Sequence, residues 1–214
     1  MARVFVYGAS GHGKVVADIL TVQGIAVEGF IDDGPREDNE KVLGLGVLGD
    51  GHWLEATARR EPVDVALGIG DNFARRRVAR RLLYGIQLLT VVHPAATIAR
   101  SAHLGAGAVV MAGSVVNPDA KIGTGAIINT GAIVEHDCQV GEFAHLSPHA
   151  AMGGCARLGE CSWLGIGAVI IHNVAVGDYA IVGAGAAVIR DLDDGVIAVG
   201  VPARIVKKQF GFEK

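Results

Sequence analysis

Large aromatic side chains are scarce in this sequence. Phe, Trp and Tyr make up 5% of its 214 residues, whereas 50% of the residues are hydrophobic and 31 are glycine. A core built around large rings is therefore excluded, and the composition favours small and aliphatic side chains packed in a repeating way. A chain of this length can bury such a core without metal ions or disulfide bonds.

Excess positive charge is also lacking. The 19 Lys and Arg stand against 22 Asp and Glu, and the net charge of -3 gives no electrostatic reason to expect nucleic acid as a partner. No apolar run reaches about 18 residues, the length of a membrane-spanning helix, and the first residues do not have the pattern of a secretory signal. We therefore expect a soluble, cytoplasmic protein.

Cysteine is rare and odd in number. Cys138, Cys155 and Cys161 lack the spacing of a zinc site or a redox pair, so the sequence predicts reduced thiols and no bound metal. Cys138 falls at an inward-pointing position of the repeat described next, and we expect it to fill the core.

A six-residue repeat runs without a break from Ile98 to residue 187 and gives fifteen hexads. The first position of each hexad is a large aliphatic residue, counting Met152, and the fifth is Ala, Ser or Cys, with Val174 as the largest member. Because strand side chains alternate between faces, both positions can point inward, with a turn between successive hexads. Glycine recurs at the second position, where we expect a tight corner. With one hexad for each of three flat faces, a coil takes three hexads, and the repeat predicts five coils of a triangular parallel β-helix.

Residues 1–92 have no hexads and alternate between strand-like and helical patterns. The expected strands cover residues 4–7, 26–31, 63–69 and 88–92, and the expected helices cover residues 15–22 and 73–84. This alternation predicts an α/β domain with a small, Rossmann-like parallel sheet, whose ligands bind at the carboxyl ends of the strands. The two domains are therefore expected at residues 1–92 and 93–214.

The turn GASGHGK, residues 8–14, joins the first expected strand to the first helix. Such a turn can present backbone N–H groups to a phosphate, although its GxxGxG spacing is not that of a dinucleotide fingerprint. Asp32, about twenty residues later, stands where a dinucleotide enzyme holds a ribose. The domain at 1–92 is only half of a dinucleotide fold, so a mononucleotide or nucleotide-linked ligand fits it better. The arginines at 75–77, 80 and 81 are interpreted as a solvated helix face, from which one side chain could reach a phosphate.

Five motifs together resemble one known family. They are YGASGHGKVVADIL at residues 7–20, FIDD at 30–33, GIGDN at 68–72, EHDCQVGEFAHLSPHA at 135–150 and GVPARIVKK at 200–208. With them, the whole chain resembles the sugar acyltransferases of the sialic-acid O-acetyltransferase and bacillosamine-pathway type (PglD/NeuD-like), which are hexapeptide-repeat enzymes with a left-handed β-helix. The resemblance implies an acetyl-CoA-dependent N-acetyltransferase acting on the 4-amino group of an amino-dideoxy sugar linked to UDP, GDP or dTDP. It also implies a homotrimer with active sites between adjacent subunits.

The same resemblance implies roles for individual residues. It makes His136 the general base, with Asp137 beside it where many members have a glutamate, and it places His145 near the acceptor and the acetyl group. The backbone N–H of Gly154 would face the thioester carbonyl. The positions implied for the nucleotide sugar are Gly8, Ser10, Gly11, His12, Asp32, Asp33 and Asn72, and those implied for CoA are Gly154, His172, Gly183, Ala184, Pro202 and Arg204.

The repeat supports one of these assignments independently of the family. Gly154 lies three hexads after His136, so the two should sit on the same edge of adjacent coils, roughly 5 Å apart. A neutral histidine is well suited to take the proton that an attacking amine loses, and a carboxylate can fix its tautomer. His149 has no counterpart in the family pattern, and we expect it to be structural.

Three alternatives remain open from the residues. The first is an O-acetyltransferase on sialic acid or a related sugar, which would use the same base. The second is an NAD-linked sugar enzyme fused to a β-helix, and the third is a non-catalytic solenoid or scaffold. Histidines and acidic residues clustered in one stretch disfavour the third alternative.

Overall fold

The computed structural model describes residues 2–35, 41–82 and 85–208. Contacts between residues divide the chain into two compact units, Met1–Pro94 and Ala95–Lys214. The division falls just after the boundary expected from the sequence.

The first unit is an α/β sheet domain. Its elements in chain order are β1 (Arg3–Tyr7), α1 (Gly11–Val22), β2 (Val27–Ile31), β3 (Lys41–Val42), β4 (Leu45–Gly49), α2 (Gly51–Ala58), β5 (Val63–Leu67), α3 (Asn72–Arg81), β6 (Ile86–Leu88) and β7 (Val91–Val92). The sheet has the strand order β3-β4-β2-β1-β5-β6. Neighbouring strands from β4 to β6 in this order are parallel, and β3 is antiparallel to β4. The carboxyl ends of β1, β2 and β5 therefore meet at one edge of the sheet, as expected for a ligand site.

Both faces of this sheet bury apolar side chains. Phe5 and Tyr7 on one face of β1 belong to a hydrophobic cluster with Leu54 of α2 and Val78 of α3. Helix α1 buries a stripe that includes Leu20 and contacts β1, β2 and β5. Because helices supply apolar side chains to the sheet, β1 reads as an almost continuous apolar run, which made it visible in the sequence.

The sequence missed the hairpin β3–β4 and helix α2. Glycines at 46 and 49 interrupt the apolar alternation of β4, so periodicity does not mark this strand. The strand expected at 88–92 is instead divided between β6 and β7. The helix expected at 73–84 runs from Asn72 to Arg81, and residues 83 and 84 lie outside the described residues.

The second unit is a parallel β-helix in which a two-residue strand begins at every hexad. The strands are β8 (Thr97–Ile98), β9 (His103–Leu104), β10 (Val109–Val110), β11 (Val115–Val116), β12 (Lys121–Ile122), β13 (Ile127–Ile128), β14 (Ile133–Val134), β15 (Gln139–Val140), β16 (His145–Leu146), β17 (Ala151–Met152), β18 (Arg157–Leu158), β19 (Trp163–Leu164), β20 (Val169–Ile170), β21 (Ala175–Val176), β22 (Ile181–Val182) and β23 (Ala187–Val188). The hexad register predicted from the sequence is therefore kept through the whole repeat.

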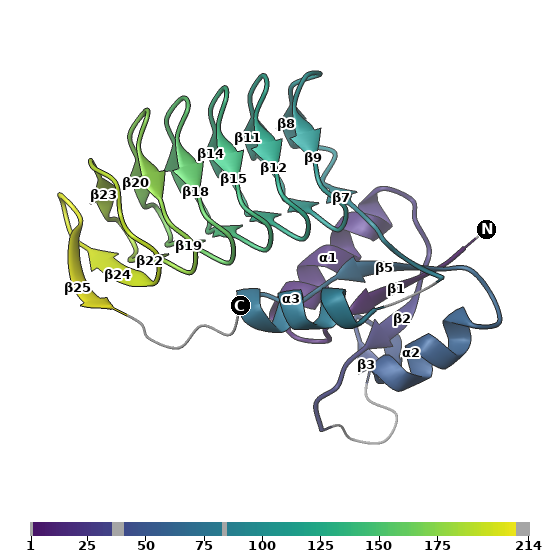
Figure 1. Ribbon diagram of the computed structural model, residues 1–214. Coiled ribbons are helices and arrows are strands. Elements are labelled where there is room, and N and C mark those ends of the chain that lie inside the picture. The colour runs from purple at the N-terminus through teal and green to yellow at the C-terminus, as the bar shows by residue number, and fades with distance from the viewer. Residues whose placement is uncertain (1, 36–40, 83–84, 209–214) are drawn as a thin grey trace. The chain divides into compact units, whose positions relative to one another are not determined.

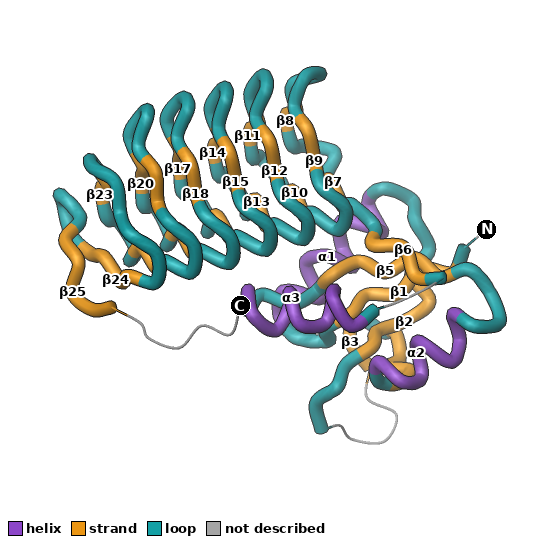
Figure 2. The backbone as a smooth tube through the Cα atoms, viewed as in Figure 1, coloured by secondary structure: helices purple, strands orange, loops and turns teal. Residues whose placement is uncertain are grey.

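Three sheets form the faces of the β-helix. The β14 face has the order β8-β11-β14-β17-β20-β23, the β15 face β9-β12-β15-β18-β21, and the β16 face β10-β13-β16-β19-β22 followed by β24. From β8 to β20, each strand pairs with the strand three places on, so that Ile133 lies opposite Ala151, three hexads later. Figures 1 and 2 show the resulting coils as successive rungs. The predicted coil of three hexads is confirmed.

The interior of the β-helix follows the predicted columns. First-position side chains are buried from Val110 to Val182, and fifth-position side chains are buried from Ala108 to Ala186, including Val174. Cys138 is fully buried, and its thiol donates to the carbonyl oxygen of Gly153 at 3.1 Å. Burial raises the pKa of this thiol to about 11, so Cys138 fills the core as expected.

The second hexad position requires a residue without a Cβ, as expected, but the sharp turn does not lie there. Positive φ angles occur at the fourth position instead, for example 60° at Asp137. At the second position, a Cβ on Gly123 would lie 2.6 Å from the backbone nitrogen of Glu142 in the next coil, and one on Gly141 would lie 2.5 Å from that of Glu160. Glycine is required there because successive coils approach closely, and not for its backbone freedom.

The repeat is followed by β24 (Val196–Val199) and β25 (Arg204–Lys208), which pair antiparallel to each other. β24 also pairs with β22 and so continues the β16 face. Within the described ranges, the chain has no helix that is both long and apolar enough to cross a membrane.

Candidate active site

His136 and Asp137 lie in the turn from β14 to β15. The imidazole Nδ1 of His136 is 2.8 Å from Oδ2 of Asp137, and each side chain is 58% exposed. The hydrogen bond to Asp137 raises the pKa of His136, a small loss of hydration opposes this shift, and the charges of Asp137 and Glu135 add to it. With a proton on Nδ1 held by the carboxylate, the neutral ring carries its lone pair on Nε2.

Nε2 of His136 faces the next coil at Gly154. A Cβ on Gly154 would lie 2.6 Å from Nε2 and 2.7 Å from Cε1 of the ring. The neighbouring backbone N–H of Cys155 donates to the carbonyl oxygen of His136 at 2.9 Å. The predicted stacking of residues 136 and 154 is confirmed, and the ring occupies the space that a larger residue at 154 would need.

The same edge continues over two further coils. The backbone N–H of Asn173 donates to the carbonyl oxygen of Gly154 at 3.0 Å, which places the exposed His172 in the coil after Gly154. Arg190, also exposed, follows β23 at this edge, in a turn two residues shorter than the earlier ones, because Val176 pairs with Leu192 whereas Ile170 pairs with Val188. We call the line formed by residues 136, 154, 172 and 190 the His136 edge. Sequence reasoning missed Arg190, which lies just beyond the last complete hexad.

Gly183 and Ala184 lie at a different edge. They follow β22 in the turn from the β16 face to the β14 face, whereas the His136 edge joins the β14 face to the β15 face. Ala184 is exposed, but a Cβ on Gly183 would lie 2.7 Å from Cγ1 of Val199 in β24. Gly183 is thus needed for packing, and within one chain neither residue is brought to the His136 edge.

Pro202 and Arg204 lie where the chain turns from β24 into β25. This turn is attached to the last coil, because the backbone N–H of Ala203 donates to the carbonyl oxygen of Ala187 at 2.7 Å. Arg204 is exposed, and its Nη1 donates to the carbonyl oxygen of the preceding residue at 3.1 Å. The motif therefore holds a cationic side chain at the end of the β-helix.

His145 lies on the β16 face and is 6% exposed. Its ring stacks on Trp163, the residue three hexads later, with 5.4 Å between the ring centroids and 12° between the ring planes. Its Nε2 is 3.0 Å from Nδ2 of Asn129, whose Oδ1 accepts from the backbone N–H of Thr130 at 2.8 Å. Because this last bond fixes the amide orientation, Nε2 of His145 accepts the hydrogen bond from Nδ2 of Asn129, in the tautomer that carries its hydrogen on Nδ1.

The three histidines of residues 134–150 are therefore held at three different places on the coil. His136 lies at the edge between the β14 and β15 faces, and His145 lies on the β16 face. His149 occupies a left-handed turn position between the β16 and β14 faces, with φ 58°, against Gly131 of the preceding coil. Within one chain, only His136 combines an adjacent carboxylate with the stacked Gly154.

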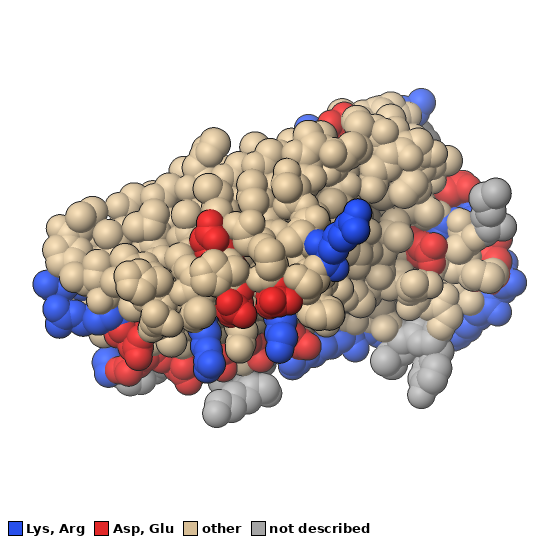
Figure 3. Space-filling view, turned by 90° about the horizontal axis from the view of Figure 1, so that it is seen from above, with Lys and Arg blue, Asp and Glu red and all other residues tan. Residues whose placement is uncertain are grey.

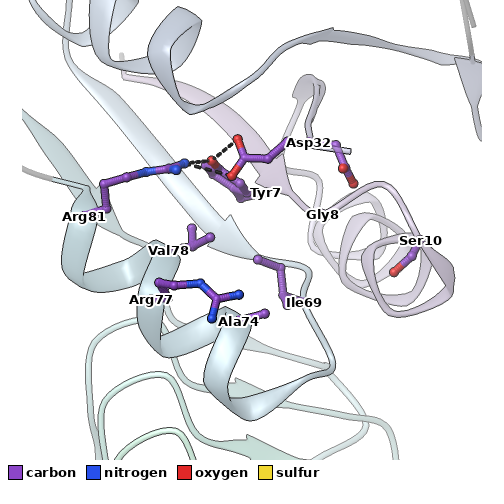
Figure 4. A pocket seen from close by; sticks show the side chains of 10 residues that line it. Tyr7, Gly8, Ser10, Asp32, Ile69, Ala74, Arg77, Val78 and Arg81 are labelled. Atoms are coloured by element: carbon purple, nitrogen blue, oxygen red, sulfur yellow. Dashed lines mark hydrogen bonds and ion pairs between the residues drawn. The ribbon is translucent and has the colours of Figure 1, made fainter. Parts of the chain in front are cut away.

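The first unit has its own pocket, with a volume of about 310 Å³, at the carboxyl ends of β1, β2 and β5. Its lining residues are Tyr7, Gly8, Ser10, Asp32, Asp33, Ile69, Ala74, Arg77, Val78 and Arg81. Figure 4 shows Arg77 and Arg81 of α3 on one side and Ser10, just before α1, on the other. Polar groups of both signs thus surround a partly apolar cavity, as in many ligand sites.

Asp33 is engaged by the protein itself. Its Oδ1 accepts from the hydroxyl of Tyr7 at 2.8 Å and from the N–H of Gly51 at 3.0 Å, and its Oδ2 is 2.9 Å from Nη2 of Arg81. Partial burial opposes it, but these donors and the charge of Arg81 lower the pKa of Asp33. The carboxylate that was expected to meet the ligand therefore positions Arg81 at the pocket wall.

Asp32 also binds backbone groups around the pocket. Its Oδ2 accepts from the N–H of Ala9 at 2.7 Å and its Oδ1 from the N–H of Gly34 at 2.8 Å. These bonds tie the turn after β1 to the end of β2. Asp32 lines the pocket as expected, with its carboxylate oriented by both loops.

The glycines of the turn after β1 are present for different structural reasons. Gly8 has φ 109°, and a Cβ on it would lie 2.6 Å from the carbonyl oxygen of Gly68, so the fold itself requires glycine. A Cβ on Gly11 would meet nothing within 4 Å. Ser10 is the N-cap of α1 but makes no side-chain capping bond to the helix. The amides of the first turn of α1 thus lie beside an open space that could accept an anion.

Asn72 and Arg75 belong to the interior of this unit, and His12 is partly buried. Arg75 is fully buried, donating from Nη1 to the carbonyl oxygens of Ile69 and Gly70, each at 3.0 Å, and from Nη2 to Oδ1 of Asn72 at 2.8 Å. The expectation that all the arginines of this helix are solvated is wrong for Arg75. Asn72, 3% exposed, commits its side-chain oxygen to Arg75 and not to a ligand. Burial, helped by the charge of Arg75, lowers the pKa of His12 to about 4, so this ring is neutral at pH 7.

Comparisons with known proteins match both units. The model of the PglD N-terminal domain matches residues 3–82. PerB from Caulobacter crescentus, whose structure contains CoA and GDP-perosamine, is 41% identical, with 97% of this chain and 98% of PerB covered and a TM-score of 0.91. The acetyltransferase domain of PglB from Neisseria gonorrhoeae FA1090, solved with acetyl coenzyme A, is 35% identical, with 95% and 98% covered and a TM-score of 0.88.

The chain belongs to the PglD-like family of hexapeptide-repeat acetyltransferases. Among curated proteins, UDP-N-acetylbacillosamine N-acetyltransferase of Bacillus subtilis (strain 168) is 36% identical over 121 residues, and this match spans 52% of each chain. Membership in the PglD-like family confirms the predicted fold class, a Rossmann-like domain followed by a left-handed parallel β-helix. It also confirms the predicted enzyme class, because the matched relatives include named acetyltransferases whose structures contain CoA or acetyl-CoA.

Proposed function

We propose that this protein is an acetyl-CoA-dependent N-acetyltransferase that acts on the 4-amino group of a nucleotide-linked amino-dideoxy sugar, with His136 as general base. The observation that carries this proposal is the His136 edge, where a carboxylate-bound imidazole presents Nε2 beside Gly154. Family membership supports the acetyl donor, and the GDP-perosamine bound to PerB supports the class of acceptor.

In this reaction the sugar amine attacks the carbonyl carbon of the acetyl thioester. As the new C–N bond forms, the amine nitrogen loses a proton, which Nε2 of His136 accepts. Asp137 holds the Nδ1–H and stabilises the resulting imidazolium. When the C–S bond breaks, the proton passes from the imidazolium to the sulfur of CoA, and the acetamido sugar is released.

Gly154 is suited to the oxyanion that forms during this attack. Its backbone N–H would donate to the oxygen of the tetrahedral intermediate, a contribution of about 3 kcal/mol in other acyl-transfer enzymes. Because Gly154 has no side chain, the acetyl group of acetyl-CoA and the ring of His136 can meet on one edge. His172, Arg190 and Arg204 are proposed to contact the remainder of CoA, whose phosphates need cationic partners.

The pocket of the first unit is the proposed site of the nucleotide. The open start of α1 at Ser10 and Gly11 can bind a phosphate through backbone N–H groups. Arg77 supplies a cation across the same pocket. His12 is not among the residues that line this pocket, and its neutral ring adds no charge at pH 7.

We also propose a homotrimer in which adjacent subunits complete each active site. Outward strand residues of the β14 face are apolar from β11 to β23, namely Val115, Ile133, Ala151, Val169 and Ala187. Ile133 and Val169 are 39% and 38% exposed in the single chain, as expected of a face that packs against another subunit. Figure 3 shows that much of the surface seen from above carries no Lys, Arg, Asp or Glu. Since both substrates are made in the cytoplasm, we propose that compartment as the site of action.

The test is CoA-thiol release from acetyl-CoA with UDP-, dTDP- and GDP-linked 4-amino sugars and with sialic acid. We expect one nucleotide-linked amine to be acetylated, and His136→Ala to lower kcat by at least about a hundredfold while Tm stays unchanged. Near-normal turnover in His136→Ala would remove the histidine from the mechanism. Acetylation of sialic acid alone would make the protein an O-acetyltransferase.

A further inference from the structure

One cluster of side chains on the His136 edge has donors of three kinds. A nitrogen of His136, a carboxylate oxygen of Asp137 and the sulfur of Cys155 lie within 4.8 Å of one another, and all three residues are exposed. Cys138 and Cys161 are buried, so Cys155 carries the exposed thiol of this chain. The acetyl transfer described above does not use that thiol.

The repeat explains why these three groups meet. Asp137 and Cys155 are three hexads apart and occupy the same left-handed turn position in adjacent coils, each with φ 60°. Identical backbone conformations in stacked turns project the two side chains side by side. The hydrogen bond from the Cys155 N–H to the carbonyl oxygen of His136, at 2.9 Å, fixes the spacing of the two turns.

The donor set matches a thiophilic divalent cation. Imidazole nitrogen, carboxylate oxygen and thiolate sulfur are the three kinds of ligand that Zn²⁺ takes, with bond lengths of about 2.0 to 2.3 Å. Tetrahedral geometry then places the ligand atoms about 3.3 to 3.8 Å apart. Small side-chain rotations close the present separations, and exposed side chains on a fixed backbone can make them. Hard cations such as Mg²⁺ prefer all-oxygen ligands and do not suit a thiolate.

Access to the cluster is open. Asp137 and Cys155 line a cleft of about 720 Å³ on the outside of the β15 face, together with His103, Asp119, Lys121, Gln139 and Arg157. A hydrated cation can therefore reach the three donors and keep a water molecule as its fourth ligand.

We propose that His136, Asp137 and Cys155 form an inhibitory site for Zn²⁺. The bound ion occupies a nitrogen of the His136 ring and the carboxylate that orients it, so the ring cannot accept the proton of the sugar amine. The inhibition rests on the proposed function, whereas the binding of the ion does not. No step of the proposed acetyl transfer uses this ion.

The binding test uses Co²⁺ as a spectroscopic substitute in the full-length protein. We expect one equivalent of Co²⁺ to produce a thiolate-to-metal charge-transfer band, and one equivalent of Zn²⁺ to abolish it. Cys155→Ser should remove the band, and Cys155→Asn should do the same while keeping a residue that accepts positive φ, as Asn173 does in the same column. His103→Ala is the matched control in the same cleft and should keep the band. Absence of the band in the wild type, or its survival in both Cys155 variants, overturns the site.

The inhibition test compares the rate of each variant with its own rate in a chelator. Zn²⁺ should inhibit the wild type and His103→Ala reversibly, Mg²⁺ should inhibit neither, and either Cys155 variant should need at least about tenfold more Zn²⁺ for the same inhibition. Equal Zn²⁺ sensitivity in the wild type and the Cys155 variants overturns the proposal. If the protein transfers no acetyl group, the proposed function fails, and the Co²⁺ band still decides whether the ion binds.

Discussion

Replacing Gly154 by alanine tests the geometry of the His136 edge directly. The added Cβ would lie 2.6 Å from Nε2 and 2.7 Å from Cε1 of His136, closer by about 1 Å than carbon and nitrogen atoms normally approach without a bond. The ring must therefore swing out by a similar distance, and it can do so because His136 is largely exposed. The backbone N–H at 154 stays in place, so the change displaces the base and keeps the proposed oxyanion donor.

The expected cost appears in catalysis and not in folding. A misplacement of about 1 Å lowers the rate by about a hundredfold in enzymes that depend on orientation, which equals about 2.7 kcal/mol of activation free energy. Gly154 does not have a positive φ, so alanine is compatible with its backbone. We expect kcat to fall about a hundredfold and the free energy of unfolding to change by less than about 1 kcal/mol.

The neighbouring glycine provides the matched control. A Cβ on Gly153 would lie 2.6 Å from the backbone nitrogen of His172, an atom that cannot move without opening the coil. Gly153→Ala should therefore lower Tm, whereas Gly154→Ala should lower kcat at an unchanged Tm. Steady-state kinetics and thermal unfolding, measured on both variants, show which substitution lowers kcat and which lowers Tm. Normal turnover in Gly154→Ala would refute the reasoning, because the ring could then not be the base in the position that the structure gives it.

Two further predictions concern the first unit. Arg77→Ala should raise KM for the nucleotide sugar about tenfold or more with little change in kcat, because it removes a charged partner from the pocket. Arg80→Ala, which lies outside the pocket lining, should change neither KM nor kcat. Equal KM values for both variants and the wild type would exclude a phosphate contact at Arg77. The pKa of His12 is lowered from 6.5 to about 4 in the folded state, so the unfolded state binds more protons between these two pH values. The contribution of His12 to the free energy of unfolding is therefore fully present above pH 6.5 and is lost as the pH falls toward 4. At pH 4.5, this group lowers the free energy of unfolding by about 2.5 kcal/mol. Between about pH 6.5 and about pH 4.5, the free energy of unfolding measured in urea should therefore fall by about that much more for the wild type than for His12→Asn. An equal fall in both proteins would contradict the burial of a neutral ring.

The β-helix could be predicted from the sequence because its neighbours follow from counting. A coil of constant length makes residues three hexads apart adjacent, and this alone placed His136 against Gly154. The same counting pairs His145 with Trp163, whose rings do stack. The signal for these contacts was present in the sequence. The sequence did not reveal which glycines lie in the turns, because composition does not separate a glycine needed for close approach from one needed for positive φ.

The first unit was less predictable for a different reason. Its apolar strands β1, β2 and β5 were visible as runs of buried residues, but its polar contacts come from loops that are distant in sequence. Arg75 looks like any other arginine of a basic helix, and it is buried because the carbonyl oxygens after β5 and the side chain of Asn72 satisfy its guanidinium. Asp33 likewise looks like a ligand residue but holds Arg81. Neither role follows from periodicity.

The interpretation of Gly154 uses both its place in the repeat and its contacts in the structure. Glycines at the second hexad position are required by the backbone of the next coil, and those at the fourth position adopt positive φ. Gly154 stands at the third position, has no positive φ, and the three atoms nearest to its missing side chain all belong to the ring of His136. The closest obstacle to a small side chain at this position is therefore that imidazole. A glycine whose nearest steric neighbour is an exposed histidine is explained if that histidine acts on a substrate, and for this reason the pair supports the proposed reacting edge more firmly than either residue alone.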